Sequence, residues 1–208
     1  MTLKVLSLSE LLTGTKQEVN AKIPAIKNML NTFETISITG SQSAHDVDNF
    51  LKNKSVIFDK QGLSRTHLVF SSYKGQTILV GYFTISNKPL IFTKRMLDKC
   101  SKTLKKKLYQ KGETHSSNDN LIIQGYLVAQ IGKNYSKEAL ATKAINGKDL
   151  LTLAYEMIES GAKIFGGSYI WVEYEDTEKL KRYYKDFGFT EIENHTSENG
   201  LKMAILKI

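Results

Sequence analysis

Three side chains in the C-terminal part of the sequence are of types that move protons. Glu173 and Glu175 alternate along the segment SYIWVEYE, and Tyr184 follows in the segment YYKDFGF. Alternation along a strand places both carboxylates on one face, together with Tyr169 and Trp171. Either carboxylate could accept a proton directly or through water, and the phenol of Tyr184, with an ordinary pKa of about 10, could donate one. A carboxylate that only faces solvent and a tyrosine with its hydroxyl at the surface are the structural alternatives.

A second group of residues, in the segment KAINGKDLL, is suited to binding an anion. Gly147 permits close approach of the backbone, and Lys143 and Lys148 add positive charge. A turn at a helix N-terminus supplies unpaired backbone N–H groups and a favourable dipole. The residues of this turn are Lys143, Ala144, Ile145, Asn146, Gly147 and Lys148. A helix cap without any ligand is the alternative.

Other kinds of site are not expected. The four histidines, at positions 45, 67, 115 and 195, lie far apart and have no nearby partner at metal-ligand spacing. The single cysteine, Cys100, excludes an internal disulfide and any CxxC site, and we expect it to be a small buried hydrophobe. No GxxxxGKS/T phosphate loop, GxGxxG fingerprint or HExxH motif is present.

The elements that must position these residues alternate between strand and helix. A continuous apolar strand is predicted over 121–132, a helix from 147 that Gly161 ends, a strand over 167–175, a helix over 177–188, and two closing strands. This order in short succession predicts an α/β fold with at least one parallel strand pair.

Upstream, the strands THLVFSSY and QTILVGYFTIS are separated by Lys74 and Gly75, which predicts a β-hairpin. A helix that begins near Ser43 is expected to run into a short strand at SVIF, residues 55–58. We predict that residues 1–42 form an N-terminal helical extension, in which Ser9 caps a short helix, and that residues 43–208 form the main domain.

The 208 residues carry 29 Lys and Arg against 21 Asp and Glu, a net charge of +8. Residues 94–111 hold eight basic side chains and one acid, so a local charge of +7 falls on one predicted amphipathic helix, inserted in the main domain. Its lysine-rich face is either a solvated surface or a surface that attracts polyanions. No apolar run approaches the roughly 20 residues that span a bilayer, and we expect a cytoplasmic protein.

The segments YLVAQIG, NGKDLL and YYKDFGF, in this order, resemble the core of the GNAT superfamily of acetyl-CoA-dependent N-acetyltransferases. Tyr184, Gly188 and Phe189 match the superfamily's frequent helix ending Y-x-x-x-G-F, and the resemblance covers residues 45–208. The phrases FLKNKSVIFDKQGLSRTHLVF and YLVAQIGKNYS are similar to uncharacterised GNAT proteins of Gram-positive bacteria and their prophages. The resemblance implies a central mixed, mostly antiparallel sheet with one splayed parallel pair, flanked by helices.

The resemblance also implies an activity, the transfer of acetyl from acetyl-CoA to a primary amine by direct attack. The pantetheine arm would lie along Gln130, Ile131, Gly132 and Lys133, and the turn at 143–148 would hold the pyrophosphate. Tyr184, whose place matches the family's tyrosine, would be the acid. Glu175, or else Glu173, is our choice of base because both lie toward the C-terminal end of their strand, where open α/β sheets bind ligands. The turn departs from the superfamily's Q/R-x-x-G-x-G/A pattern, because Thr142 and Ile145 stand where Gln or Arg and Gly are common.

The acceptor stays open at this point. A small amine, a protein amine and an aminoacyl-tRNA that binds through the basic helix at 94–111 are the three options, and a homodimer is compatible with each. The alternative function is a non-catalytic acyl-CoA or nucleic-acid binding protein with a degenerate GNAT fold.

Overall fold

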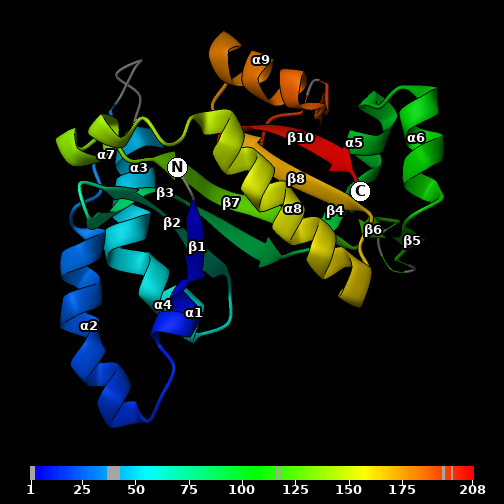
Figure 1. Cartoon of the computed structure of the whole chain (residues 1–208). Coiled ribbons are helices and arrows are strands. Elements are labelled where there is room, and N and C mark those ends of the chain that lie inside the picture. Colours follow the sequence, from blue (N-terminus) through cyan, green and yellow to red (C-terminus); the bar gives the residue numbers. More distant parts are fainter. Residues whose placement is uncertain (1–2, 37–42, 116, 118, 194, 198) are drawn as a thin grey trace. The chain divides into compact units, whose positions relative to one another are not determined.

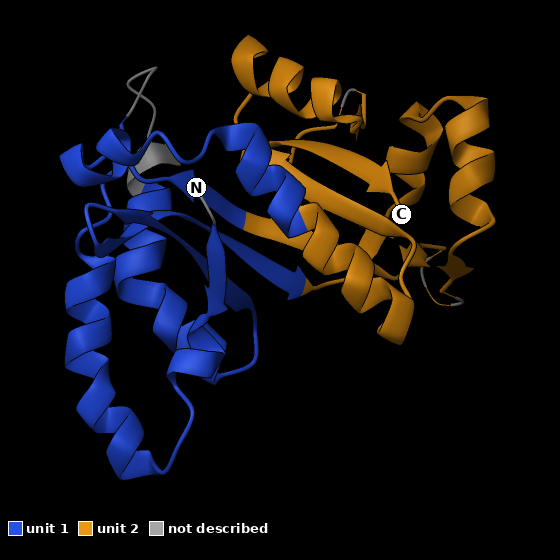
Figure 2. Ribbon diagram, in the orientation of Figure 1, with its two compact units in different colours: residues 1–86, 130–154 blue, residues 87–129, 155–208 orange. Residues whose placement is uncertain are grey.

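The computed structural model describes residues 3–36, 43–115, 117, 119–193, 195–197 and 199–208, and the chain divides into two compact units. Figure 2 colours the first unit, residues 1–86 and 130–154, in blue, and the second, residues 87–129 and 155–208, in orange. Strand β7 and helix α8 each begin in one unit and end in the other. Among the described residues, no helix has the length and apolar character that crossing a membrane requires.

The first unit combines an antiparallel set of strands with helices from the N-terminal third of the chain (Figure 1). Its strands follow the order β1-β2-β3-β7, with β1 antiparallel to β2 and β2 antiparallel to β3. Its elements are β1 (Lys4–Ser7), α1 (Leu8–Leu11), α2 (Lys16–Leu30), α3 (Ser43–Asn49), the π-helix η1 (Phe50–Lys54), α4 (Ser55–Lys60), β2 (Arg65–Tyr73), β3 (Gln76–Asn87), the end of β7 (Gly125–Lys133), α7 (Lys137–Thr142) and the start of α8 (Gly147–Phe165).

The second unit holds the strand that carries the two candidate carboxylates. Strand β8 is parallel to β7 and antiparallel to β10, and β10 is antiparallel to β9, so the order is β7-β8-β10-β9. A small sheet has the strand order β4-β6-β5, and helices α5 and α6 lie between β4 and β5 in the sequence. The elements of the second unit are β4 (Leu90–Phe92), α5 (Lys94–Lys99), α6 (Lys102–Tyr109), β5 (Glu113–Thr114), β6 (Leu121–Ile123), β8 (Tyr169–Tyr174), α9 (Glu178–Phe187), β9 (Thr190–Glu191) and β10 (Lys202–Lys207). The predicted fold class, a mostly antiparallel sheet with one parallel pair and flanking helices, is confirmed.

The predicted hairpin between β2 and β3 is confirmed. Lys74 and Gly75 both have positive φ, 49° and 78°, which is the backbone that a tight two-residue turn needs. Tyr73 and Gln76 close the ladder on either side of the turn.

The N-terminal segment contributes to the core of the first unit. Strand β1 pairs with β2, and the side chains of Leu8, Leu30 and Phe33 are fully buried in the cluster that also holds Leu68 and Tyr82. The predicted end of the extension, at residues 37–42, lies outside the described residues.

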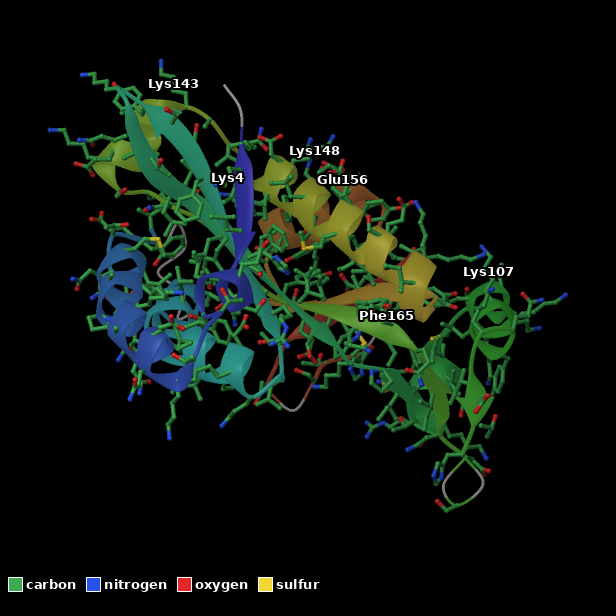
Figure 3. The ribbon with its side chains drawn as sticks, turned by 60° about the horizontal axis from the view of Figure 1, so that its bottom comes forward. Lys4, Lys107, Lys143, Lys148, Glu156 and Phe165 are labelled. Atoms are coloured by element: carbon green, nitrogen blue, oxygen red, sulfur yellow. The ribbon has the colours of Figure 1, made fainter. Side chains whose placement is uncertain are left out.

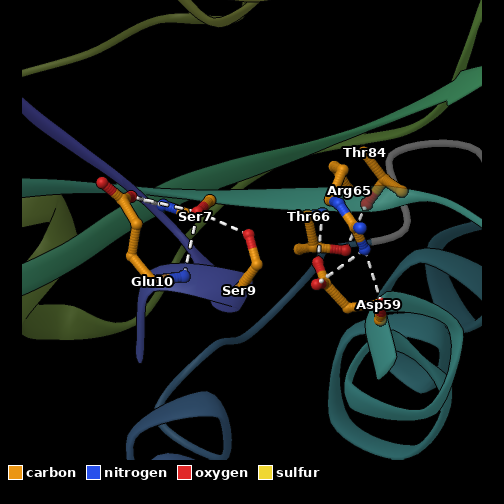
Figure 4. Close-up of polar contacts among 7 residues, drawn as sticks. All are labelled: Ser7, Ser9, Glu10, Asp59, Arg65, Thr66 and Thr84. Atoms are coloured by element: carbon orange, nitrogen blue, oxygen red, sulfur yellow. Dashed lines mark hydrogen bonds and ion pairs between the residues drawn. The ribbon is translucent and has the colours of Figure 1, made fainter. Parts of the chain in front are cut away.

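Two local predictions in the first unit are wrong. The caps of α1 and α2 are Ser7 and Thr15, not Ser9, and each forms a reciprocal capping box with a glutamate three residues on. The segment 55–58 is part of helix α4, not a strand. The position of α4 against β2 is fixed by Asp59. Its carboxylate accepts a hydrogen bond from the N–H of Thr66, 3.0 Å away, and one from Arg65 (Figure 4).

Three predictions in the second unit are also wrong. The basic segment 94–111 forms two helices, because Cys100 adopts an extended backbone (φ −75°, ψ 146°) and Ser101 caps α6. The apolar run 121–132 is divided at Gln124 between β6 and β7. Helix α8 continues past Gly161 to Phe165 and ends where Gly166 turns to φ +78°.

Asn134 joins separate segments of the first unit immediately after β7. Its side-chain oxygen accepts hydrogen bonds from the N–H groups of Glu34 (3.0 Å) and Ser136 (2.9 Å), and its amide nitrogen donates to the carbonyls of Leu79 (2.7 Å) and Thr32 (3.3 Å). Its side chain is 1% exposed, so these bonds form out of water, where an unmet polar group is costly. The end of β7 is therefore fixed to both β3 and the N-terminal segment.

Gly132 is required by packing inside β7. A Cβ atom at this position would stand 2.7 Å from Val47 Cγ1, 2.9 Å from Phe33 Cζ and 3.1 Å from Tyr82 Cε1. Tyr82 is fully buried and its hydroxyl donates to the Val47 carbonyl at 2.7 Å, so these groups have little room to move. The glycine lets the N-terminal segment and β3 meet over the strand.

We expect Gly132→Ala to lower the free energy of unfolding by about 1–3 kcal/mol, because overpacking a rigid core forces neighbours to shift. Gly161→Ala is the matched control, since a Cβ atom added at this position of α8 would have nothing within 4 Å. That substitution should raise stability by about 0.5–1 kcal/mol through helix propensity. Urea unfolding of both variants measures the difference, and equal changes would show that the Gly132 contact is not tight.

Candidate active site

The turn before α8 is closed by side chains of its own. The N–H of Asn146 donates to Asp149 Oδ2 at 2.8 Å, and the N–H of Asp149 donates to Asn146 Oδ1 at 3.1 Å. This reciprocal pair is a capping box, and it satisfies two of the amides that a helix N-terminus leaves open. The side chain of Ile145 is 6% exposed and belongs to the core.

Lys143 has a backbone conformation that lysine rarely adopts. It ends α7 in the left-handed region with φ 49° and ψ 24°, and its N–H donates to the Leu140 carbonyl at 3.2 Å. The next amide, of Ala144, donates to the hydroxyl of the buried Thr142 at 3.1 Å. Non-glycine residues in this region carry strain of order 1 kcal/mol, which is typical of functional turns.

The turn is therefore suited to an anion mainly through lysine side chains. Lys143 and Lys148 are both exposed, and Figure 3 shows them in the first unit, Lys143 on the loop after α7 and Lys148 at the start of α8. The amides of Lys143, Ala144, Asn146 and Asp149 already donate within the protein. A diphosphate fits this turn if the two ammonium groups supply most of the contacts.

The strand candidates lie at the end of β7, in the same unit as the turn. Gln130, Ile131, Gly132 and Lys133 are all partly buried, and the ammonium of Lys133 lies 5.5 Å from the centre of the Tyr135 ring. Asn134 fixes the strand directly beyond them. All ten residues predicted to bind the cofactor lie in the first unit.

The parallel pairing of β7 with β8 is short. The register joins Gly125 with Tyr169 and ends at Leu127 with Trp171, although β8 continues to Tyr174. In the second unit, Val128 and Ala129 of β7 therefore lie beyond the paired part of the strand. Backbone groups at such a point can pair with an added extended chain.

Tyr184 stands at the C-terminal end of α9 and is held by an aromatic group. Its ring centre lies 4.9 Å from that of Tyr174 and 5.5 Å from that of Phe189. Tyr184 is 6% exposed, and burial raises the pKa of its phenol to about 12. The hydroxyl therefore keeps its proton at neutral pH.

The spacing of Tyr184, Gly188 and Phe189 has a structural cause. The N–H of Gly188 donates to the Lys185 carbonyl at 2.9 Å, and the N–H of Phe189 donates to the Tyr184 carbonyl at 3.0 Å. Gly188 has φ 112°, so the helix ends in a Schellman motif, whose apolar contact is the pair Phe189 and Tyr184.

Glu173 projects from the face of β8 that is opposite to Tyr184. Glu173 lies on the face of β8 that carries Tyr169 and Trp171, which pack in the cluster with α5 and α6. Tyr174, on the opposite face, is the residue that contacts Tyr184. Glu175 follows the last residue of β8 and is partly buried. Within the second unit, β8 thus separates Glu173 from Tyr184.

Sequence reasoning missed a pocket of about 680 Å³ between α9 and the strands β8, β9 and β10. Tyr174, Tyr184 and Phe189 line it, together with Glu191, whose Oε2 accepts a hydrogen bond from the Tyr174 hydroxyl at 2.7 Å. Alternation had placed Tyr174 opposite Glu173, but only the pairing of β10 with both β8 and β9 brings Glu191 beside it.

Cys100 and the histidines are not arranged for chemistry in the part of the chain that the structure describes. The Cys100 thiol donates to the Met96 carbonyl at 3.4 Å, and burial raises its pKa, which disfavours a thiolate. Among described residues, no three His, Cys, Asp or Glu side chains are grouped as metal ligands.

No protein-family model matches the sequence, and no curated protein is similar to it in sequence. Solved structures of bacterial toxins are similar to it in fold. The AtaT toxin complexed with acetyl-methionyl-tRNAfMet has a TM-score of 0.60 at 16% identity, over 99% of this chain and 95% of that chain. A tyrosine-to-phenylalanine mutant of KacT gives 0.58 at 18% identity, over 100% and 95%. An AtaT mutant of the same kind, bound to acetyl-CoA and the C-terminus of its antitoxin AtaR, gives 0.56 at 14% identity, over 99% and 92%. The chain therefore has the GNAT-like fold of the AtaT and KacT toxins.

Proposed function

We propose that the chain is an N-acetyltransferase that transfers acetyl from acetyl-CoA to a primary amine by direct attack. The observation that carries the proposal is the fold, which over nearly the whole chain is similar to a toxin structure bound to acetyl-CoA. In this proposal the first unit would hold coenzyme A through the backbone at the end of β7 and through the lysine-bearing turn before α8.

The cofactor contacts divide between backbone and side chains. Backbone groups along Gln130–Lys133 would pair with the amides of the pantetheine arm, as an added strand pairs with an edge. Lys143 and Lys148 would hold the pyrophosphate, because four amides of the segment are already bonded within the protein. When bound, acetyl-CoA supplies the activated carbonyl.

Tyr184 acts in this proposal as the acid toward the leaving sulfur. As the amine nitrogen forms its bond to the acetyl carbon, the carbon–sulfur bond breaks and negative charge develops on sulfur. A phenol whose pKa is about 12 stays protonated and donates a hydrogen bond to that sulfur. Full proton transfer to a thiolate of ordinary pKa about 8.5 is uphill by more than a factor of 10³, so solvent completes it.

Glu175 is our assignment for the base that takes a proton from the acceptor ammonium. It follows the end of β8, whereas Glu173 projects from the face of β8 opposite Tyr184. Glu173 is retained as the alternative, acting through water.

The acceptor option favoured by a specific observation is an aminoacyl-tRNA. Residues 94–111 carry eight basic side chains, seven of them on α5 and α6 and the eighth at Lys111, and Asp98 is the one acid among them. Figure 3 shows Lys107 extending from α6 away from the ribbon. The AtaT structure with an acetylated methionyl-tRNA has the same fold.

A second function, a non-catalytic acyl-CoA or nucleic-acid binding protein, is favoured by the capping box at Asn146. That box places the carboxylate of Asp149 in the turn where phosphate would bind. Turnover of acetyl-CoA in the presence of amines distinguishes this function from the enzyme.

Lys143→Gly separates a cofactor role from a structural one. Glycine relieves the left-handed strain, so stability should stay unchanged or rise by up to ~1 kcal/mol, while acetyl-CoA affinity in isothermal titration should fall about five- to tenfold. Lys74→Gly is the matched control, because Lys74 has the same φ of 49° in the hairpin turn. Equal affinities of the two variants would assign the turn before α8 to helix capping alone.

Tyr184→Phe keeps the ring that packs on Tyr174 and Phe189 and removes only the donor. We expect kcat for any accepted amine to fall about 10²-fold, with acetyl-CoA affinity within about twofold of the parent. Steady-state kinetics and titration measure the two quantities. Unchanged turnover would remove Tyr184 from the mechanism.

For the tRNA option, neutralising Lys105, Lys106 and Lys107 to Gln should weaken tRNA binding and reduce its salt slope by about two to three. The control carries the same change of charge in the first unit, with Lys16, Lys27 and Lys60 replaced by Gln, and should leave the slope nearly unchanged. Filter binding over a salt series measures both. Identical slopes in the two triple variants would contradict a role of α6 in binding tRNA.

A further inference from the structure

An aromatic wall forms one side of the pocket under α9. Tyr174, Tyr184 and Phe189 are 5%, 6% and 5% exposed, and they pack ring against ring at 4.9 Å and 5.5 Å. A volume of about 680 Å³ is typical of sites for small molecules or for one group of a larger ligand. The wall is suited to an apolar or aromatic body.

Four of the five charged side chains that α9 contributes to the pocket lining form ion pairs. The ammonium of Lys181 lies 2.7 Å from Asp176 and 3.2 Å from Glu178, and the guanidinium of Arg182 lies 3.5 Å from Asp186. The remaining charged lining residue of α9 is Lys185.

Glu191 brings negative charge to the aromatic wall. One of its oxygens accepts the hydrogen bond of the Tyr174 hydroxyl at 2.7 Å, which fixes the carboxylate against the rings. Burial first, and then Glu191 itself, raise the pKa of Tyr174, so the phenol stays a donor. Within the described chain, neither Glu191 nor Glu193 forms an ion pair, and Lys185 is the remaining lining cation. The pocket therefore has an acidic surplus beside its rings.

We propose that this pocket binds the acceptor of the transfer, as a protonated primary amine attached to an apolar or aromatic group. The assignment rests on the proposed function, because it takes Tyr184 to lie beside both the leaving sulfur and the attacking amine. Reacting atoms must come within about 3–3.5 Å of each other, so the acceptor must bind beside Tyr184. Tyr184 lines this pocket whereas Glu175 does not, so the proton of the bound ammonium would reach Glu175 through water.

The sign of the ligand's charge follows from the same contacts. An ammonium beside Glu191 gains an ion pair with the carboxylate that the Tyr174 hydroxyl holds in place. A carboxylate in that place would be repelled by the like charge of Glu191. The pocket should therefore select amines over acids of equal shape.

The test uses equilibrium titration of the full chain without acetyl-CoA. Phenethylamine is the probe, and 3-phenylpropionate is its anionic counterpart. We expect phenethylamine to bind at least about tenfold more tightly than 3-phenylpropionate, and Glu191→Gln to weaken phenethylamine about five- to tenfold. Glu159→Gln is the matched control, because Glu159 pairs with Lys163 on α8 at 3.1 Å and does not line the pocket.

Phenylalaninamide and N-acetyllysine methylamide distinguish the source of the amine. Tighter binding of the first indicates an α-amine next to a carbonyl, as in an aminoacyl group or a chain N-terminus, and tighter binding of the second indicates a lysine side chain. Either preference supports the amine site. Absence of phenethylamine binding at millimolar concentration, or equal effects of Glu191→Gln and Glu159→Gln, would overturn it.

The two proposals fail in different ways. Amine binding that depends on Glu191, in a protein that neither binds nor consumes acetyl-CoA, would keep the pocket and reject the transferase. Acetylation of amines with a KM that Glu191→Gln leaves unchanged would keep the transferase and reject this pocket as the acceptor site. Thermal unfolding of Glu191→Gln, expected within a few degrees of the parent, shows that a change in KM is not a loss of fold.

Discussion

The carboxamide of Asn134 is the contact on which the arrangement of the first unit depends. Both of its polar atoms are used twice, by backbone groups of the N-terminal segment, of β3 and of the loop that leads to α7. An apolar residue at 134 would remove all four bonds from a buried place, where backbone groups are costly to leave unmet. This one side chain holds the end of β7 in place, and every cofactor contact proposed for the strand depends on that position.

The ending Y-x-x-x-G-F serves structure before it serves chemistry. A Schellman motif needs a residue with positive φ, which is Gly188, and an apolar residue after it that packs back on the last turn, which is Phe189. Tyr184 is the residue on which Phe189 packs. Its ring is therefore explained by helix termination, and only its hydroxyl is left to be explained by function. A phenylalanine would satisfy the motif equally well, so the test of chemistry lies in that oxygen.

Local signals predicted much of the fold, and tertiary contacts decided the rest. The turn at 74–75 and the helix before Gly188 follow from backbone preferences that act over a few residues. The segment 55–58 was misassigned because a short apolar run suits a helix or a strand equally, and here the contact of Asp59 with β2 decides. Sequence reasoning identified the candidate residues by their type, but it did not show on which face of the sheet each side chain lies. The pair of Tyr174 and Glu191 depends on a strand register that no local pattern contains.

The capping box at Asn146 shifts the source of cofactor affinity toward the strand. Asp149 offsets one of the two positive charges that Lys143 and Lys148 bring to the turn, and it occupies an amide that would otherwise face phosphate. Less of the binding free energy can then come from the pyrophosphate, and more must come from backbone pairing along β7. That pairing requires a strand held at a fixed position and free of side-chain obstruction. Gly132 meets the second requirement and Asn134 the first, so two residues without a chemical role set how well the acetyl group is placed.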